Sequence, residues 1–297
     1  MILAGCGMMV FLGIAGCGKS GGSASGNKTA GTLQIKGSDT IVNANQKLSE
    51  EFMKDHADIF VAVTGGGSGV GIASLINKSC DIAAASREMT AEEIQMAKAK
   101  GVNPKEITVA YDGVAVILNK NNPVEKLAIA DLNKIFTGEV TNWKEFGGKD
   151  LPIVTLSREV SSGTYAYFKE MVIHLGKKDG KAEFSSKTLL MSSSQAIVEE
   201  VVNNEGAIGY LGMGYLSDRI HALHVAVAKD KEYYSPDLAA VMNKTYPLSR
   251  PLYFYCDGEP QGATKLFVEF TLSPKGQKQF VDTGFVPLEA ANAPKIQ

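Results

Sequence analysis

Serine, threonine and glycine residues gather in three short segments of the chain, each placed between an apolar run and a helical pattern. We name them the first loop (Gly37–Thr40), the second loop (Thr64–Gly71) and the third loop (Arg158–Thr164). The first backbone amides of a helix have no partner within it, and a strand followed by such a loop and a helix aims these amides at an anion. In the third loop, the guanidinium of Arg158 adds a charged fork that suits a tetrahedral oxyanion. Together the three loops predict a site for a small oxyanion.

Each loop also has a simpler structural interpretation. Serine, aspartate and threonine in the first loop are preferred helix caps, and the glycines of the second loop are typical of a flexible turn. The second loop matches neither the dinucleotide-binding pattern nor the hydrolase nucleophile elbow, because Val70 stands where each pattern requires glycine. The third loop also fits a surface arginine beside a serine-rich cap. Ser86 and Arg87 end a further predicted strand, where the arginine is either an anion ligand or a surface charge.

These loops contain no histidine or cysteine that could act as a catalytic base, a thiol nucleophile or a metal ligand. The four histidines are His56, His174, His221 and His224, and none belongs to a loop. The four cysteines, at positions 6, 17, 80 and 256, lack the paired spacing of metal ligands. A hydrolase requires a nucleophile with a base, or a metal. We therefore expect a binding protein with no metal and no cofactor, and an exported phosphatase or hydrolase is the alternative from another class.

The composition is that of an ordinary globular protein with a large core. Of 297 residues, 44% are hydrophobic and 21% are charged, and 30 Lys and Arg nearly balance 32 Asp and Glu. A net charge of -2 provides no field that attracts a polyanion. We therefore expect no nucleic-acid partner, and any anion must be bound by a local site.

The pattern of the N-terminal segment predicts an export signal rather than part of the fold. Residues 1–18 carry no charge, and Ile14–Cys17 resembles the lipoprotein signal-peptidase motif, in which the cysteine is lipidated. Gly13–Ser20 also satisfies the nucleotide-binding P-loop pattern, but glycines and serines follow it instead of a helix. We expect a signal peptide over residues 1–17, lipidation of Cys17 and a flexible tether over residues 18–31.

From residue 32 onward, short apolar runs alternate with amphipathic stretches, which indicates an α/β protein with largely parallel sheets. We expect strands near residues 33–35, 59–63, 81–85, 107–118, 153–156, 207–210 and 251–255. We expect helices near residues 40–52, 72–76, 91–100, 164–175, 196–202, 263–271 and 274–281.

The ordered motifs resemble the periplasmic phosphate-binding proteins of phosphate ABC transporters, the PstS family. The resemblance covers nearly all of the chain after the tether. It rests on Gly37–Thr40, Gly66–Gly69, Asp81–Ala83 with Ser86 and Arg87, Asp112–Val116, Ile135–Gly138, Asn142 with Trp143, Arg158 with Ser162–Thr164, and Gly206–Tyr210.

This resemblance implies a type II solute-binding fold, in which mixed sheets flanked by helices form two lobes and the ligand lies in the cleft between them. Residues 32–112 and 252–290 would form the first lobe, and residues 113–251 the second. The family pattern implies phosphate ligands from both lobes, and we include Arg87 at its strand end. The expected ligands are Ser38, Thr40, Ser68, Ser86 and Arg87, with the backbone amides of Asp39 and Gly67, from the first lobe, and Arg158, Ser162, Gly163 and Thr164 from the second.

The implied function is high-affinity phosphate binding outside the cytoplasmic membrane and delivery to the permease subunits of an ABC transporter. The implied form is a monomer held at the membrane by the lipid on Cys17. Another tetrahedral oxyanion, namely sulfate, molybdate or tungstate, is the alternative ligand.

One position departs from the family pattern. In longer members an aspartate after the Ala-Ser pair accepts the proton of phosphate, whereas this chain has Arg87 there. Asp39 and Asp112 are the candidate acceptors, and we hypothesise an Arg87–Asp112 pair where the chain crosses between lobes. Cys80 and Cys256 fall in the same lobe, where we expect two buried thiols rather than a disulfide.

Overall fold

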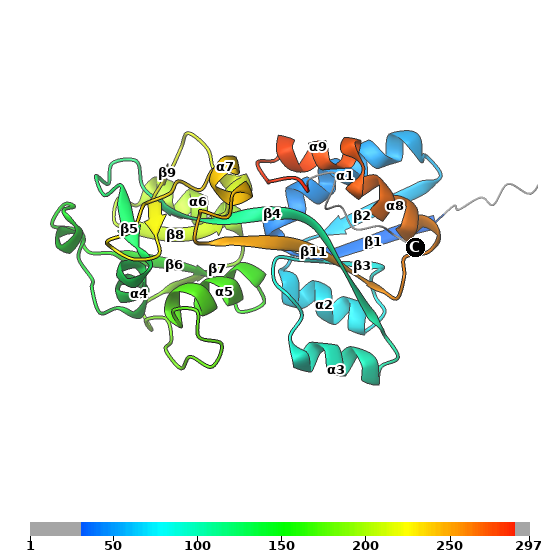
Figure 1. Ribbon diagram of the computed structural model, residues 1–297, viewed down its shortest axis with the longest axis horizontal. Helices are drawn as coiled ribbons and strands as arrows, with labels where there is room; N and C mark the ends of the chain where they lie inside the picture. The colour runs from blue at the N-terminus through cyan, green and yellow to red at the C-terminus, as the bar shows by residue number, and fades with distance from the viewer. Residues whose placement is uncertain (1–30, 289–297) are drawn as a thin grey trace, which may run out of the picture.

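The computed structural model describes residues 31–288. The predicted signal peptide, the lipidation site at Cys17 and residues 18–30 of the predicted tether lie outside the described residues. Within them, the alternation of apolar runs and amphipathic stretches yields a mixed α/β fold (Figure 1). This confirms the predicted fold class.

The strands of residues 31–288 form a nine-stranded sheet and a small two-stranded one. The large sheet has the order β2-β1-β3-β11-β4-β8-β6-β7, with β9 paired to β4, and β10 pairs with β5 in the small sheet. The strands are β1 (Gly31–Gly37), β2 (Ile59–Thr64), β3 (Ile82–Ala85), β4 (Pro104–Leu118), β5 (Lys126–Ala128), β6 (Val154–Arg158), β7 (Leu189–Met191), β8 (Ala207–Gly212), β9 (His221–Ala222), β10 (His224–Ala226) and β11 (Ser249–Asp257).

Helices cover both faces of the large sheet (Figure 1). They are α1 (Val42–Asp55), α2 (Ser68–Ile76), α3 (Ala91–Ala99), α4 (Ile129–Thr137), α5 (Gly163–Phe168), α6 (Ser194–Asn203), α7 (Leu238–Met242), α8 (Gly262–Leu272) and α9 (Pro274–Asp282). Short helical turns occur at η1 (Asp39–Ile41), η2 (Trp143–Phe146), η3 (Lys169–Ile173) and η4 (Met213–Tyr215).

Two strands, β4 and β11, run through the middle of the molecule and join two groups of elements (Figure 1). We call the group with β1–β3, α1–α3, α8 and α9 the first lobe, and the group with β5–β10 and α4–α7 the second lobe. Strand β4 pairs with β11 up to Gly113 and with β8 from Val114 onward. This change of partner lies beside the predicted lobe boundary, which itself stays a prediction.

The sheet is less parallel than the alternating pattern suggested. Strand β1 runs parallel to β2 and β3, and β6 runs parallel to β7 and β8. Every pairing of β4 or β11 is antiparallel: β4 pairs with β8, β9 and β11, and β11 also pairs with β3. The sheet is therefore mixed.

The predicted long helix near residues 164–175 changes type along its length. It begins as the α-helix α5 and continues as the π-helix η3. Phe168, the last residue of α5, stacks on Tyr210 of β8 with ring centroids 3.7 Å apart. Phe136 of α4 contacts both rings edge-on. This aromatic cluster fixes α5, and with it the third loop, against β8.

Candidate anion-binding site

The first lobe contributes hydroxyl groups from the ends of neighbouring strands. Strands β1 and β3 are parallel and adjacent, so their carboxyl ends lie at the same edge of the sheet. Ser38 follows β1 and Ser86 follows β3, and the amide of Ser38 donates to the carbonyl of Ala84 at 2.8 Å. Parallel pairing thus places residues that are far apart in the sequence side by side.

The second loop brings α2 to the same edge. Gly71, in the first turns of α2, packs so closely on β1 that a Cβ there would lie 2.4 Å from the carbonyl oxygen of Lys36. Ser68 therefore begins its helix next to Ser86. The amide of Ser86 donates to Oγ of Ser68 at 3.0 Å, and the two hydroxyl oxygens are 3.3 Å apart.

The third loop carries the contribution of the second lobe. Ser162 caps α5, and its Oγ accepts hydrogen bonds from the amides of Thr164 and Tyr165. A Cβ at Gly163 would lie 2.3 Å from Oγ of Ser68 and 2.6 Å from that of Ser86. Because Gly163 has no side chain, the two lobes meet at this point.

A hydroxyl cluster buried between the lobes results from these contacts. Oγ1 of Thr40 and Oγ1 of Thr164 are 2.7 Å apart, joining the first loop to the third. Each cluster residue is at most 3% exposed; the members are Ser38, Thr40, Ser68, Ser86, Ser162 and Thr164. All six are residues that the sequence predicted for the site. The structure thus brings together the predicted hydroxyl residues of both lobes.

Two polar atoms at the predicted site are buried without a partner. They are Oγ of Ser38 and Nε of Arg158. The remaining guanidinium nitrogens of Arg158 are engaged, because Nη1 donates to Oγ of Ser194 and Nη2 to the carbonyl of Ser192. A buried donor without an acceptor is costly, since it loses its hydration and gains nothing in exchange. Both atoms are therefore available to a bound ligand.

Asp39 joins the lobes through its carboxylate and its backbone carbonyl. Its Oδ2 lies 3.1 Å from Nη1 of Arg158 and accepts the amide of Ser194 at 2.8 Å. Its carbonyl accepts the hydroxyl of Tyr215 at 2.7 Å. These partners belong to the second lobe, so Asp39 holds the lobes against each other.

The glycines of the second loop make a second contact between the lobes. The amide of Gly69 donates to the carbonyl of Ser161 at 2.9 Å. Gly67 has a φ of 99°, and a Cβ there would lie 2.7 Å from the same carbonyl oxygen. The amide of Gly67, which we predicted as a ligand, donates to the carbonyl of Gly37 instead.

Arg250 was missed by the sequence analysis, although it contacts more of the cluster than any predicted arginine. Its Nη2 donates to Oγ1 of Thr164 at 2.9 Å and lies 3.5 Å from Oγ1 of Thr40, and its Nη1 donates to the carbonyl of Ser86 at 2.9 Å. Its Nε and Nη2 both donate to Oδ2 of Asp112, at 3.0 and 2.7 Å. Burial raises the pKa of Asp112, and the attraction of Arg250 opposes that shift.

The available signal for Arg250 was its position just before the strand expected near residues 251–255, at the predicted boundary between the lobes. Detecting it requires the register of β11 on β4, which pairs Arg250 with Asp112 across 138 positions of sequence. Local pattern does not supply that register.

Arg87 forms an ion pair with Glu93 of α3. Its Nη1 and Nη2 donate to the two carboxylate oxygens of Glu93, each at 2.7 Å. The hypothesised Arg87–Asp112 pair is therefore wrong, because Asp112 pairs with Arg250 and Arg87 with Glu93. The sequence could not distinguish these arrangements, since both arginines follow or begin strands near the crossing.

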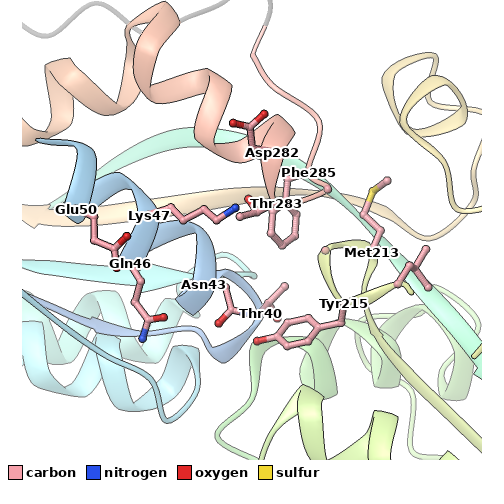
Figure 2. Close-up of a pocket in the computed structure, with 13 residues that line it drawn as sticks. Thr40, Asn43, Gln46, Lys47, Glu50, Met213, Tyr215, Asp282, Thr283 and Phe285 are labelled. Atoms are coloured by element: carbon pink, nitrogen blue, oxygen red, sulfur yellow. The ribbon is translucent and has the colours of Figure 1, made fainter. Parts of the chain in front are cut away.

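Two hollows flank the hydroxyl cluster. One, of about 600 Å³, lies between α1, η4 and the turn after α9, and Thr40 and Tyr215 line it together (Figure 2). The other, of about 880 Å³, lies between the start of α3 and the helices α5 and η3, and its lining includes Ser86 and Arg250. The cluster thus occupies the closed middle of a cleft between the lobes.

The described part of the chain offers no grouping of three or more His, Cys, Asp and Glu side chains suited to a metal ion. Within residues 31–288, no helix combines the length and the apolar character needed to span a bilayer.

Comparison with known proteins supports the expectation drawn from the motifs. The model of the PBP superfamily domain matches residues 22–275. The phosphate-binding protein PstS of Staphylococcus epidermidis is 33% identical over 288 residues, covering 94% of this chain and 86% of the relative. The chain belongs to the PstS family. The SphX protein of Synechococcus elongatus is also 33% identical, over 86% of this chain and 77% of SphX.

Solved structures of the family share the fold. A substrate-binding protein assigned to a phosphate ABC transporter of Clostridium perfringens, solved with bound phosphate, gives a TM-score of 0.77 at 32% identity. That match covers 87% of this chain and 100% of the other. A phosphate transport receptor of Vibrio cholerae gives 0.69 at 29% identity, over 86% of this chain and 100% of the other. The type II solute-binding fold expected for the PstS family is thereby confirmed.

Proposed function

We propose that this protein binds inorganic phosphate outside the cytoplasmic membrane and delivers it to the permease of a phosphate ABC transporter. The observation that carries the proposal is the buried hydroxyl cluster, to which both lobes contribute. Two buried polar atoms there lack partners, namely Oγ of Ser38 within the cluster and Nε of the nearby Arg158. The relatives named above are phosphate-binding proteins, which supports phosphate as the ligand of this chain. The chain is a substrate-binding protein of transport and not an enzyme.

The cluster suits phosphate energetically. A dianion loses its hydration in a closed cleft, so donors must replace water on each oxygen. A hydrogen bond to a charged group contributes about 1.5–3 kcal/mol, and micromolar affinity requires about 8 kcal/mol net. Several hydroxyl donors and the guanidinium of Arg158 are sufficient for that affinity after the cost of ordering them.

Calorimetric titration of the protein, stripped of bound anion, tests the ligand. We expect phosphate to bind at micromolar or tighter concentrations, and sulfate, molybdate and tungstate to bind more weakly. Ser68→Ala should weaken phosphate binding about tenfold or more, because one charge-assisted hydrogen bond is lost. Ser74→Ala, in the same helix but outside the cluster, is the matched control. Tighter binding of another oxyanion, or equal binding by Ser68→Ala and Ser74→Ala, contradicts the proposal.

Phosphate differs from sulfate in carrying a proton near neutral pH, so a carboxylate acceptor favours phosphate. Asp39 and Asp112 are the candidate acceptors, and each holds an arginine beside the cluster. Competition assays between phosphate and sulfate, carried out on Asp39→Asn and on Asp112→Asn, show which of the two carboxylates accepts the proton of phosphate. The variant without the acceptor should lose its preference for phosphate, and an unchanged preference removes that residue from consideration.

We also propose that the mature protein is a monomer attached to the membrane through a lipid on Cys17. The motif Ile14–Cys17 and the glycine- and serine-rich residues after it support this anchor. In the native host, Cys17→Ser should move the protein from the membrane fraction to the soluble fraction. Light scattering of the released protein should give the mass of one chain. Retention of Cys17→Ser in the membrane fraction, or the mass of a dimer, contradicts these points.

A further inference from the structure

Arg250 and Asp112 face each other on the two strands that connect the lobes. Arg250 lies near the start of β11, Asp112 lies within β4, and the two residues are directly paired in the antiparallel register. Figure 1 shows β4 and β11 passing side by side between the two groups of elements. The guanidinium is therefore mounted on the connection between the lobes and not on either lobe alone.

From this position one guanidinium reaches loops of both lobes. Nη1 donates to the carbonyl of Ser86 in the first lobe, and Nη2 donates to Oγ1 of Thr164 in the second. The ring of Tyr167, which lies in the second lobe, is 5.3 Å from the central carbon of the guanidinium. When the lobes separate, these contacts cannot all persist, because Ser86 and Thr164 move with different lobes.

Asp112 fixes the orientation of this fork. Its Oδ2 accepts from Nε and Nη2 of Arg250, while its Oδ1 accepts the amide of Met213 at 3.0 Å. Both side chains are nearly inaccessible, at 0% exposure for Asp112 and 2% for Arg250. A buried ion pair recovers its desolvation cost only with good geometry and further hydrogen bonds, which this pair has. Such a pair therefore suits a positioning role better than a purely stabilising one.

We propose that Arg250, oriented by Asp112, is a ligand of the bound anion and couples its binding to closure of the lobes. This inference rests on the proposed function. A dianion among the hydroxyls of Thr40 and Thr164 would lie next to Nη2 of Arg250, which already contacts both. The cation then favours the dianion over the monoanion, because attraction grows with the charge of the ligand. It also favours the closed arrangement, in which its contacts to both lobes exist together.

The test removes both charges together, so that no unpaired charge is left buried. In the double variant Arg250→Gln/Asp112→Asn, calorimetry should show phosphate affinity reduced about 10- to 100-fold, since hydrogen bonds to a charged donor are lost. The rise of affinity across the second ionisation of phosphate should become shallower than in the wild type. Small-angle scattering should show less compaction at saturating phosphate.

A matched control comes from an exposed ion pair within the second lobe. Arg219 binds both carboxylate oxygens of Glu199, at 2.7 and 2.8 Å, with each side chain 47% exposed. Arg219→Gln/Glu199→Gln should keep the affinity, the pH profile and the compaction of the wild type.

If the double variant does not fold, Arg250→Lys tests the role of Arg250 in its place. Lysine keeps the charge but not the fork, so the pH profile should persist while affinity and compaction decrease. The proposal is overturned if the folded double variant binds within about threefold of the wild type, or if its pH profile and compaction are unchanged. It is also overturned if Arg250→Lys binds and closes as the wild type does. If the wild type itself does not bind phosphate, the proposed function fails, which is a separate result.

Discussion

At the scale of single residues, the site depends on small groups that allow close approach. Gly163 meets the hydroxyls of Ser68 and Ser86 at distances that no side chain at that position permits. Ser38 and Arg158 each keep one buried polar atom without a partner. The same few residues thus serve both the contact between the lobes and the binding of the ligand.

Gly163→Ala should therefore obstruct closure without unfolding either lobe. The added Cβ would lie 2.3 Å from Oγ of Ser68 in the closed form. Overpacking of this kind costs about 1–3 kcal/mol, which corresponds to a loss of phosphate affinity of about 5- to 150-fold by calorimetry. Gly31→Ala, where a Cβ meets nothing within 4 Å, is the control. Equal affinities for the two variants would show that the lobes do not meet at Gly163.

The two described cysteines should behave as inert thiols. Cys80 and Cys256 are both free and buried, as the sequence predicted, and burial raises the pKa of each to about 12. At pH 8, labelling by a thiol reagent should be at least about a hundredfold slower in the native protein than in denaturant. Peptide mapping assigns the labelled positions. Native labelling of either residue as fast as in denaturant contradicts this account.

The same pKa shifts have a consequence for stability at high pH. An unfolded cysteine has a pKa of about 8.5. Below that pH the thiols are neutral in the folded and the unfolded protein, so their burial does not lower the free energy of unfolding and their contribution to stability is complete. As the pH rises from about 8.5 toward 12, the unfolded chain loses these protons while the folded chain keeps them. The free energy of unfolding should therefore fall over that interval. In Cys80→Ala/Cys256→Ala, urea titrations should show a smaller fall, and an identical fall would assign the loss to other groups.

At the scale of elements, the position of the site depends on how α2 and α5 are packed. Gly71 sets α2 against β1, and the aromatic cluster around Phe168 sets α5 against β8. Neither contact involves the ligand, yet each fixes the start of a helix that contributes hydroxyl groups. Helix placement is thus part of the binding site.

Gly71→Ala should destabilise the fold even though alanine is the better helix former. A Cβ at this position would meet the backbone of Lys36 at 2.4 Å, and a strand backbone within a sheet cannot easily move. We expect the free energy of unfolding to fall by about 1–3 kcal/mol in a urea titration. Val70→Ala, at an exposed position of the same helix, should cost less. A stabilised Gly71→Ala variant would show that α2 is not packed as described.

The elements themselves were largely predictable, because apolar periodicity is a local signal. The expected runs near residues 33–35 and 59–63 are β1 and β2, and the amphipathic stretch near residues 40–52 is η1 with most of α1. The short strands β5, β7, β9 and β10 and the helices α4 and α7 were not anticipated. Brief elements carry too little periodicity to be distinguished from loops, and their structure depends on tertiary pairing.

At the scale of the whole molecule, the two lobes are closed on each other through the site. Asp39 contacts Arg158 and Ser194, and Gly69 contacts Ser161, so the first two loops are both bonded to the second lobe. The sequence predicted which loops would converge, because hydroxyl- and glycine-rich segments are recognisable locally. It did not predict Arg250, because that residue joins the cluster through the long-range register of β11 on β4. Arg87 instead pairs with Glu93 of α3, a side-chain contact that the apolar periodicity does not specify.

A crystal structure of the protein grown with phosphate tests the central claim most directly. We expect tetrahedral density in the cleft within hydrogen-bonding distance of Oγ of Ser38, Oγ1 of Thr164 and Nε of Arg158, with the lobes closed. An empty hydroxyl cluster at saturating phosphate, or an anion bound at another surface of the molecule, would contradict the account.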